Sequence, residues 1–265
     1  MKDISIFINK KIKPVNPILI AGLPGIGNVG KIAVDYIRKE LKAERYATIY
    51  SKYFPQYVVM LKNGLVRMGS NTIYYVNTHK KIGSDLLLFT GDFQSASTDG
   101  QYKINSKIIE FFKNRLSGKF VYTIGGYASG EQAPKQHKVF ANATSQKVIE
   151  EFKDTGAIFN KTSGTIIGSA GMLIGFAKLN KMNGICLMGE TGFNTTYDME
   201  AAEKVISLLS KKIKIKIDTT ELKERAKQYQ SQIDALAGIS EESLEEQVPQ
   251  YPAYPENMPK PSYIR

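Results

Sequence analysis

Short apolar runs alternate with stretches of helical periodicity along most of the chain. Continuous apolar runs bounded by glycine predict buried strands at residues 18–22, 85–92, 120–126 and 184–189. Apolar residues at helical spacing predict helices over 29–41 and 102–116, from about 144, from about 169, and over 198–210. This alternation predicts an α/β protein with a mixed, mostly parallel sheet.

Two segments depart from this alternation. The runs at 46–50, 57–61, 65–68 and 72–76 predict an antiparallel meander, and Asn63-Gly64 is a hairpin-turn signal between two of them. Lysine and isoleucine alternate over 211–218, which predicts an edge strand protected by its charges.

The composition changes after residue 217. Asp218 and Glu221 predict a capping box at the start of a helix, and apolar residues then recur at steps of four and three, at Leu222, Ala226, Tyr229, Ile233 and Leu236. The last 17 residues hold five of the ten prolines, which excludes a helix or a central strand there. We therefore expect a core domain at 1–217, a helical segment at 218–248 and an extended proline-rich tail at 249–265.

The sequence ILIAGLPGIGNVGKIA, residues 18–33, contains two nucleotide-binding patterns. Gly25, Gly27 and Gly30 form GxGxxG, and the same stretch contains the GxxxxGK of a P-loop. Each pattern lacks a residue that carries its chemistry. Ile32 stands where a P-loop has Ser or Thr for magnesium, and Lys52 lies where a dinucleotide site needs an acid. We therefore expect the glycines of this stretch to form a structural turn rather than a nucleotide-binding loop.

Glycine loops also follow the other buried strands, and the carboxyl ends of strands in an open α/β sheet usually form its ligand-binding edge. Neither His79 nor His137 has a catalytic partner implied by its spacing. In 164–177, three glycines spaced by three and four predict a smooth helix face that a neighbouring backbone can approach. The candidate crevice residues are Gly25, Gly27, Asn28, Gly30, Asp92, Gly125, Gly126 and Glu190.

Composition narrows the function classes. One cysteine, Cys186, excludes an internal disulfide and a multi-cysteine zinc site, and with two histidines we expect no metal or other cofactor. The net charge of +11 comes from scattered lysines, which favour a solvated surface over nucleic-acid binding. No apolar run reaches the ~20 residues that cross a bilayer. The amino end lacks the apolar core of a signal peptide, so we expect a cytoplasmic protein.

Five motifs in order carry a family resemblance: GLPGIGNVG, LLLFTGDFQ, the IGGY loop, GTIIGSAGMLIG and GICLMGETG. Together, over about residues 17–209, they resemble the proteasome assembly chaperone 2 family in its archaeal single-chain form. The resemblance implies a three-layer α/β/α sandwich similar to nucleoside phosphorylases, no established catalytic set, self-association into homo-oligomers, and a role in assembling or binding the proteasome core particle.

The resemblance also implies docking between proteasome α subunits through a carboxyl-terminal hydrophobic-tyrosine-any motif. Here Tyr263 is third from the end and Ser262 precedes it, so the motif is displaced by one residue. The expected partner-binding residues are Tyr251, Tyr254, Tyr263, Ile264 and Arg265. Two alternatives stay open at this point: a small-molecule or nucleotide-binding enzyme that uses the glycine-rich crevice, and a scaffold for a partner other than the proteasome.

Overall fold

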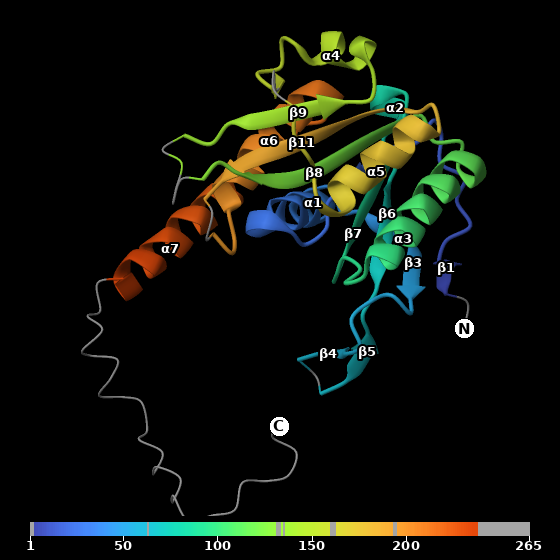
Figure 1. Cartoon of the computed structure of the whole chain (residues 1–265), viewed down its shortest axis with the longest axis horizontal. Coiled ribbons are helices and arrows are strands. Elements are labelled where there is room, and N and C mark those ends of the chain that lie inside the picture. The colour runs from blue at the N-terminus through green and yellow to red at the C-terminus, as the bar shows by residue number, and fades with distance from the viewer. Residues whose placement is uncertain are drawn as a thin grey trace, which may run out of the picture. The chain divides into compact units, whose positions relative to one another are not determined.

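The structure is a computed structural model that describes residues 3–62, 64–130, 134, 136–159, 163–192 and 195–237, with side chains up to residue 232. Strands and helices alternate along it (Figure 1). The strands are β1 (Ile4–Ile8), β2 (Ile18–Ala21), β3 (Glu44–Ser51), β4 (Val58–Met60), β5 (Val66–Met68), β6 (Asn71–Val76), β7 (Leu86–Gly91), β8 (Phe120–Ala128), β9 (Val139–Ala143), β10 (Ile158–Phe159) and β11 (Asn183–Thr191). The α-helices are α1 (Val29–Glu40), α2 (His79–Ile82), α3 (Thr98–Glu110), α4 (Gln146–Phe152), α5 (Gly168–Leu179), α6 (Met199–Ile213) and α7 (Thr220–Ala237), with a 3-10 turn at Ile26–Asn28 and a π-helical turn at Phe111–Arg115.

Nine of the described strands form one sheet in the order β1-β3-β6-β7-β2-β8-β11-β9-β10. The central strands β7, β2, β8 and β11 are parallel. On one side β6, β3 and β1 add antiparallel pairs, and on the other β9 pairs antiparallel with β11 and parallel with β10. The sheet is mixed, as predicted, with its parallel part at the centre. The carboxyl ends of the four central strands therefore share one edge.

Helices cover both faces of the sheet, which confirms the predicted α/β/α layers. The helices α1 and α6 contact each other in one layer, and α3 contacts α5 in the other (Figure 1). Leu19 and Leu87 pack with the α3 and α5 layer, whereas their neighbours Ile20 and Leu88 pack with the α1 and α6 layer. Central strands covered on both sides have no polar face. This explains why the sequence shows them as continuous apolar runs.

The predicted meander forms only in part. The strands β3 and β6 are antiparallel neighbours in the main sheet, whereas β4 and β5 pair only with each other in a separate two-stranded sheet. Asn63 lies outside the described residues, and Gly64 has the positive φ of 76° that such a turn favours. Met60, Val66 and Met68 are all more than half exposed, so the described part of the chain does not bury these apolar side chains.

The edge strand predicted at 211–218 is wrong. Helix α6 continues to Ile213, and no strand follows it before α7. Ile213, Ile215 and Ile217 are all buried in the core next to α1 and α6. The alternation therefore belongs to an extended connection that packs on the helical layer. The sequence analysis did not predict β1, β9, β10 or α2.

The chain divides into two compact units, Met1–Ala226 and Lys227–Arg265, and the fold above is that of the first. The boundary lies within α7. The carboxylate of Asp218 accepts the Thr220 N–H at 3.0 Å at the start of this helix. Glu221 does not complete the predicted capping box, because it pairs with Lys39 of α1 at 2.7 Å.

Leu222 and Ala226, the first residues of the predicted apolar seam, are buried. The side chains of Ile233 and Leu236 and the whole tail at 249–265 lie outside the described residues. None of the helices described is both long enough and apolar enough to cross a membrane.

Candidate functional site

The glycine-rich turn after β2 is held by close backbone packing. A Cβ on Gly30 would lie closer than 3.0 Å to the carbonyl oxygen of Ile124 in β8, and a Cβ on Gly22 would meet the Gly30 carbonyl. Gly27 has a φ of 58°, and a Cβ there would lie 2.8 Å from Oγ1 of Thr191. Glycine is required here because α1 lies directly against the strands. This geometry supports the structural interpretation of the turn.

The amino end of α1 is bonded to another loop of the chain. Nδ2 of Asn28 donates to the carbonyl of Thr196 at 2.9 Å, and the N–H of Asp198 donates to the carbonyl of Gly27 at 2.8 Å. The lysine of the P-loop-like pattern, Lys31, pairs with Asp35 one turn further along its own helix. That nucleotides do not bind at this turn stays a prediction.

Gln94 joins the glycine-rich segments. Its Nε2 donates to the carbonyl of Pro24 at 2.5 Å, and its Oε1 accepts the N–H of Ser169 at 2.7 Å. The Gln94 Oε1 also accepts a hydrogen bond from Nε2 of Gln101 at 3.2 Å. The Gln101 Oε1 in turn accepts one from the hydroxyl of Ser169 at 3.2 Å. One amide side chain thus ties the turn after β2 to the first residues of α5. Three of the family-like motifs, GLPGIG, TGDFQ and GTIIGSAG, meet at this side chain.

The predicted glycine stripe of α5 allows close backbone approach at one end only. A Cβ on Gly171 would lie closer than 3.0 Å to the carbonyl of Ile166, so the chain approaches closely there. Gly175 has no other heavy atom within 4 Å of its Cβ position among the described residues. The second half of the stripe is therefore open.

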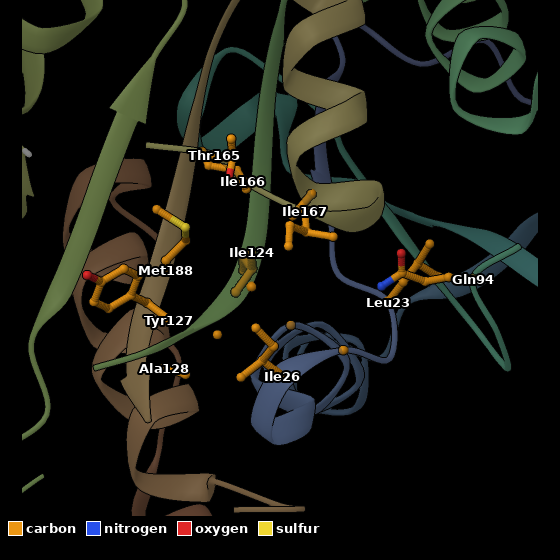
Figure 2. A pocket seen from close by; sticks show the side chains of 15 residues that line it. Leu23, Ile26, Gln94, Ile124, Tyr127, Ala128, Thr165, Ile166, Ile167 and Met188 are labelled. Atoms are coloured by element: carbon orange, nitrogen blue, oxygen red, sulfur yellow. The ribbon is translucent and has the colours of Figure 1, made fainter. Parts of the chain in front are cut away.

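A pocket of about 190 Å³ opens at the carboxyl edge of the sheet, and Figure 2 shows the side chains around it. Ile124 and Tyr127 come from β8, Met188 comes from β11, and residues 165–167 precede α5 (Figure 2). Among the described residues, no charged side chain lines it. Of the predicted crevice residues, those that line it are Gly25, Gly30, Gly125 and Gly126.

The two predicted crevice carboxylates lie outside this pocket, as do Gly27 and Asn28. Asp92 binds both terminal nitrogens of Arg67, at 2.6 and 2.8 Å, and accepts the N–H of Ser70 at 2.9 Å. Burial raises the pKa of Asp92, but these bonds outweigh it and lower the pKa below its ordinary value. Asp92 therefore fixes the loop after β5.

Glu190 is 7% exposed, and its carboxylate accepts the N–H of Lys138 at 3.2 Å. It holds the segment before β9. Neither carboxylate lines the pocket, so a crevice shared by the two stays a prediction.

Both histidines have carboxylate partners that the sequence spacing did not reveal. Nδ1 of His79 lies 2.9 Å from Asp85, a fully buried residue at the amino end of β7. Nε2 of His137 lies 3.2 Å from Glu200 at the start of α6. Neither histidine lines the pocket. Cys186 is fully buried, and this burial raises its pKa to about 11, which removes it as a nucleophile near neutral pH.

Metal ligands do not gather in the described part of the chain: no group of three or more His, Cys, Asp or Glu residues there is placed to hold an ion.

Exposed apolar side chains surround the mouth of the pocket. Ile167 is 85% exposed, Ile26 is 48% exposed and Tyr127 is 38% exposed. Contiguous apolar surface of this kind typically contacts another apolar surface, such as that of a protein partner. The sequence analysis missed these three residues, although each lies next to a glycine that it singled out. The sequence signal that could have identified them is an apolar residue within a glycine-rich loop.

These observations define a class of protein: an α/β/α sandwich whose glycine loops serve close packing and whose edge pocket is lined by no charged side chain of the described residues. Residues 19–237 match the PAC2 family, and the chain belongs to that family. An uncharacterized protein of Methanocaldococcus jannaschii is 32% identical over 242 residues, which cover 89% of this chain and 91% of that protein. A second protein of the same organism is 26% identical over 260 residues, 96% of this chain.

Solved structures agree with this assignment. PbaB of Pyrococcus furiosus, described as an archaeal proteasome activator, is 34% identical, with a TM-score of 0.83 over 89% of this chain and 100% of that chain. PbaA of the same organism, described as an archaeal homolog of proteasome-assembly chaperone, is 22% identical, with a TM-score of 0.76 over 92% of this chain and 94% of that chain. The PbaA likeness shows the fold, and both structures confirm the fold that the family resemblance implied.

Proposed function

We propose that this protein is a non-enzymatic, cytoplasmic, homo-oligomeric chaperone-like protein that acts on the proteasome. In this proposal it binds α subunits of the core particle through its carboxyl-terminal tail. The observation that carries the proposal is membership of the PAC2 family over residues 19–237, together with 34% identity to a protein described as a proteasome activator.

The chemistry of the carboxyl edge supports a binding role. In enzymes of open α/β sheets this edge holds the polar groups that react with substrate. Here the described lining of the pocket has no charged side chain, and Ile167 and Ile26 are exposed at its mouth. Asp92, the acid nearest in sequence to the pocket residue Gln94, is already bonded to Arg67. The observations therefore favour a protein-binding surface over a small-molecule enzyme.

The tail supplies residues suited to docking. Proline restricts the backbone before binding, so less conformational entropy is lost on binding. Tyr251, Tyr254 and Tyr263 supply large amphipathic side chains, and Arg265 adds a guanidinium. We propose that these residues, together with Ile264, contact the partner.

A pull-down with core-particle α subunits as bait tests the proposal. The full chain is compared with a truncation after Gln247, and the mass of each form in solution is measured by light scattering. We expect both forms to have the same oligomeric mass and only the full chain to be recovered. Equal recovery of both forms would reject the tail as the docking element. Recovery of neither form would reject the α subunits as the partner and favour a scaffold for another protein.

A further inference from the structure

A groove at the edge of the sheet opposite the pocket is lined by cationic side chains. It has a volume of about 530 Å³ and is formed by the connection from β1 to β2, the start of β3 and the segment that precedes β8. Its five basic residues are Lys10, Lys11, Lys13, Arg115 and Lys119. The pocket lies at the carboxyl ends of the parallel strands, whereas this groove lies at their amino ends. The two sites are therefore independent.

Most of the positive charge in the groove is uncompensated. Lys10 pairs with Glu44. The other four basic residues form no ion pair with any residue that the structure describes, and no described Asp or Glu lines the groove. Arg115 lies in the last turn of a helix, where a cation is favoured by the helix dipole. Lys11, Lys13 and Lys119 lie in connections between elements and have no such role.

The floor of the groove combines apolar packing with one polar group. Tyr46 is 3% exposed and Leu116 is 7% exposed, and both line the groove. The Tyr46 hydroxyl forms no hydrogen bond within the described part of the chain. Burial raises the pKa of Tyr46, which outweighs the opposing effect of Arg115, so the phenol stays protonated and can donate. The groove thus offers a neutral donor at its floor and cations at its rim.

We propose that this groove binds a small anion that carries several phosphoryl charges. Converging cations on a concave surface concentrate positive potential, and a multiply charged anion relieves the repulsion among them. The volume lies within the range of about 300–1,000 Å³ that is typical of small-molecule sites. An extended nucleic acid would instead require a continuous basic stripe, and the remaining lysines are scattered.

Calorimetric titration of the full chain with tripolyphosphate, and separately with ATP, tests the proposal at low and at moderate salt. We expect binding that weakens as salt rises, because exposed charges are screened within roughly 10 Å at 0.1 M ionic strength. Affinity for ATP above that for tripolyphosphate would show that the apolar floor contacts the nucleoside. Equal affinity would show that the phosphate chain alone is recognised. Absence of binding by both anions would overturn the proposal.

Matched variants separate this groove from the net charge of the protein. Lys11→Gln with Lys119→Gln removes two groove cations, and we expect an affinity loss of about tenfold or more, since each removes a charge-assisted contact. Lys147→Gln with Lys178→Gln makes the same charge change at exposed positions on α4 and α5 that do not line the groove. We expect less than about a threefold loss for this control, because distant exposed charges are screened. Equal losses for the two pairs would overturn the proposal.

A variant without any charge change tests the floor. Tyr46→Phe removes only the donor hydroxyl, and we expect a several-fold loss of affinity for tripolyphosphate at unchanged melting temperature. Lys31→Ala should leave binding unchanged, because Lys31 belongs to the glycine-rich turn at the other edge. Loss of binding in Lys31→Ala would show that the anion binds at the glycine-rich turn instead of the groove, and this would overturn the proposal. Tighter binding of a single-stranded oligonucleotide or a polyglutamate peptide, unaffected by Tyr46→Phe, would overturn a small-anion site.

Discussion

Gly30→Ala tests whether the glycine-rich turn is built for packing or for a nucleotide. The added methyl group would lie closer than 3.0 Å to the Ile124 carbonyl oxygen, whereas ordinary van der Waals contact is 3.4–4 Å. Both groups belong to backbone, of α1 and of β8, so neither can move aside by changing a rotamer. Overpacking of a core typically costs about 1–3 kcal/mol, and a clash between two backbones lies at the upper end of that range. Alanine recovers at most about 1 kcal/mol of helix propensity. We therefore expect a net loss of about 2 kcal/mol in the free energy of unfolding.

Thermal unfolding by calorimetry measures this loss. For a domain of this size, 1 kcal/mol corresponds to roughly 2–4 °C, so we expect a fall in Tm of about 4–8 °C. Gly164→Ala is the matched control, because a Cβ at Gly164 meets no other heavy atom of the described residues within 4 Å and the residue does not have a positive φ. Its Tm should change by less than about 2 °C. An unchanged Tm in Gly30→Ala, together with micromolar nucleotide binding that Lys31→Ala abolishes, would refute the reasoning.

Three further outcomes follow from the described contacts. Asp85→Asn removes a fully buried carboxylate that accepts hydrogen bonds from the N–H groups of Val15, Thr78 and His79. We expect the substitution to lower the free energy of unfolding by about 3–5 kcal/mol near neutral pH, which urea titration would measure. These bonds outweigh burial and lower the pKa of Asp85 in the folded state. Its contribution is therefore complete above the unfolded value of about 3.9 and is lost as pH falls through the folded pKa, so the variant should lack this part of the acid dependence. Leu222→Ala should lower the free energy of unfolding by about 2–5 kcal/mol, because Leu222 is 3% exposed in the core next to α1 and α6. An unchanged Tm would mean that α7 does not pack on the core. Gly175→Ala should raise Tm by up to a few degrees, because alanine has a higher helix propensity than glycine. Light scattering should show an unchanged oligomeric mass. A lower mass would show that a second copy of the chain packs against this position.

The central part of the fold was predictable because burial there is two-sided and local. Leu86 to Phe89 are all fully buried, so the first four residues of β7 form an unbroken apolar run. The helices α1 and α6 each carry one apolar face, and their predicted limits agree with the observed limits within a few residues. Such elements are specified by their own sequences.

The sheet flanks were not predictable in the same way, because their environment comes from distant segments. β1 is a strand because it pairs with β3, about forty residues away, and the sequence Ile4–Ile8 alone gives no signal of that partner. The alternation of lysine and isoleucine over 211–218 is compatible with a strand or with an extended connection. It became a connection because Ile215 and Ile217 pack on the helical layer. One-sided burial fixes which residues point inward and leaves the pairing partner undetermined.

The same distinction explains the candidate site. The glycines were recognisable because glycine has few structural uses, but the sequence could not show that one side chain, Gln94, connects their loops. That connection joins the carbonyl of Pro24 to the N–H of Ser169, across 145 residues of sequence. A side chain so engaged with backbone leaves little bonding capacity for a substrate. Ile167 and Ile26, which line the same pocket as Gln94, are exposed to solvent. A partner that covered these apolar side chains would remove them from water, and this would stabilise the complex. The motifs that resemble nucleotide-binding loops thus build a closely packed edge with exposed apolar side chains, and this supports the proposal that the edge contacts a protein surface.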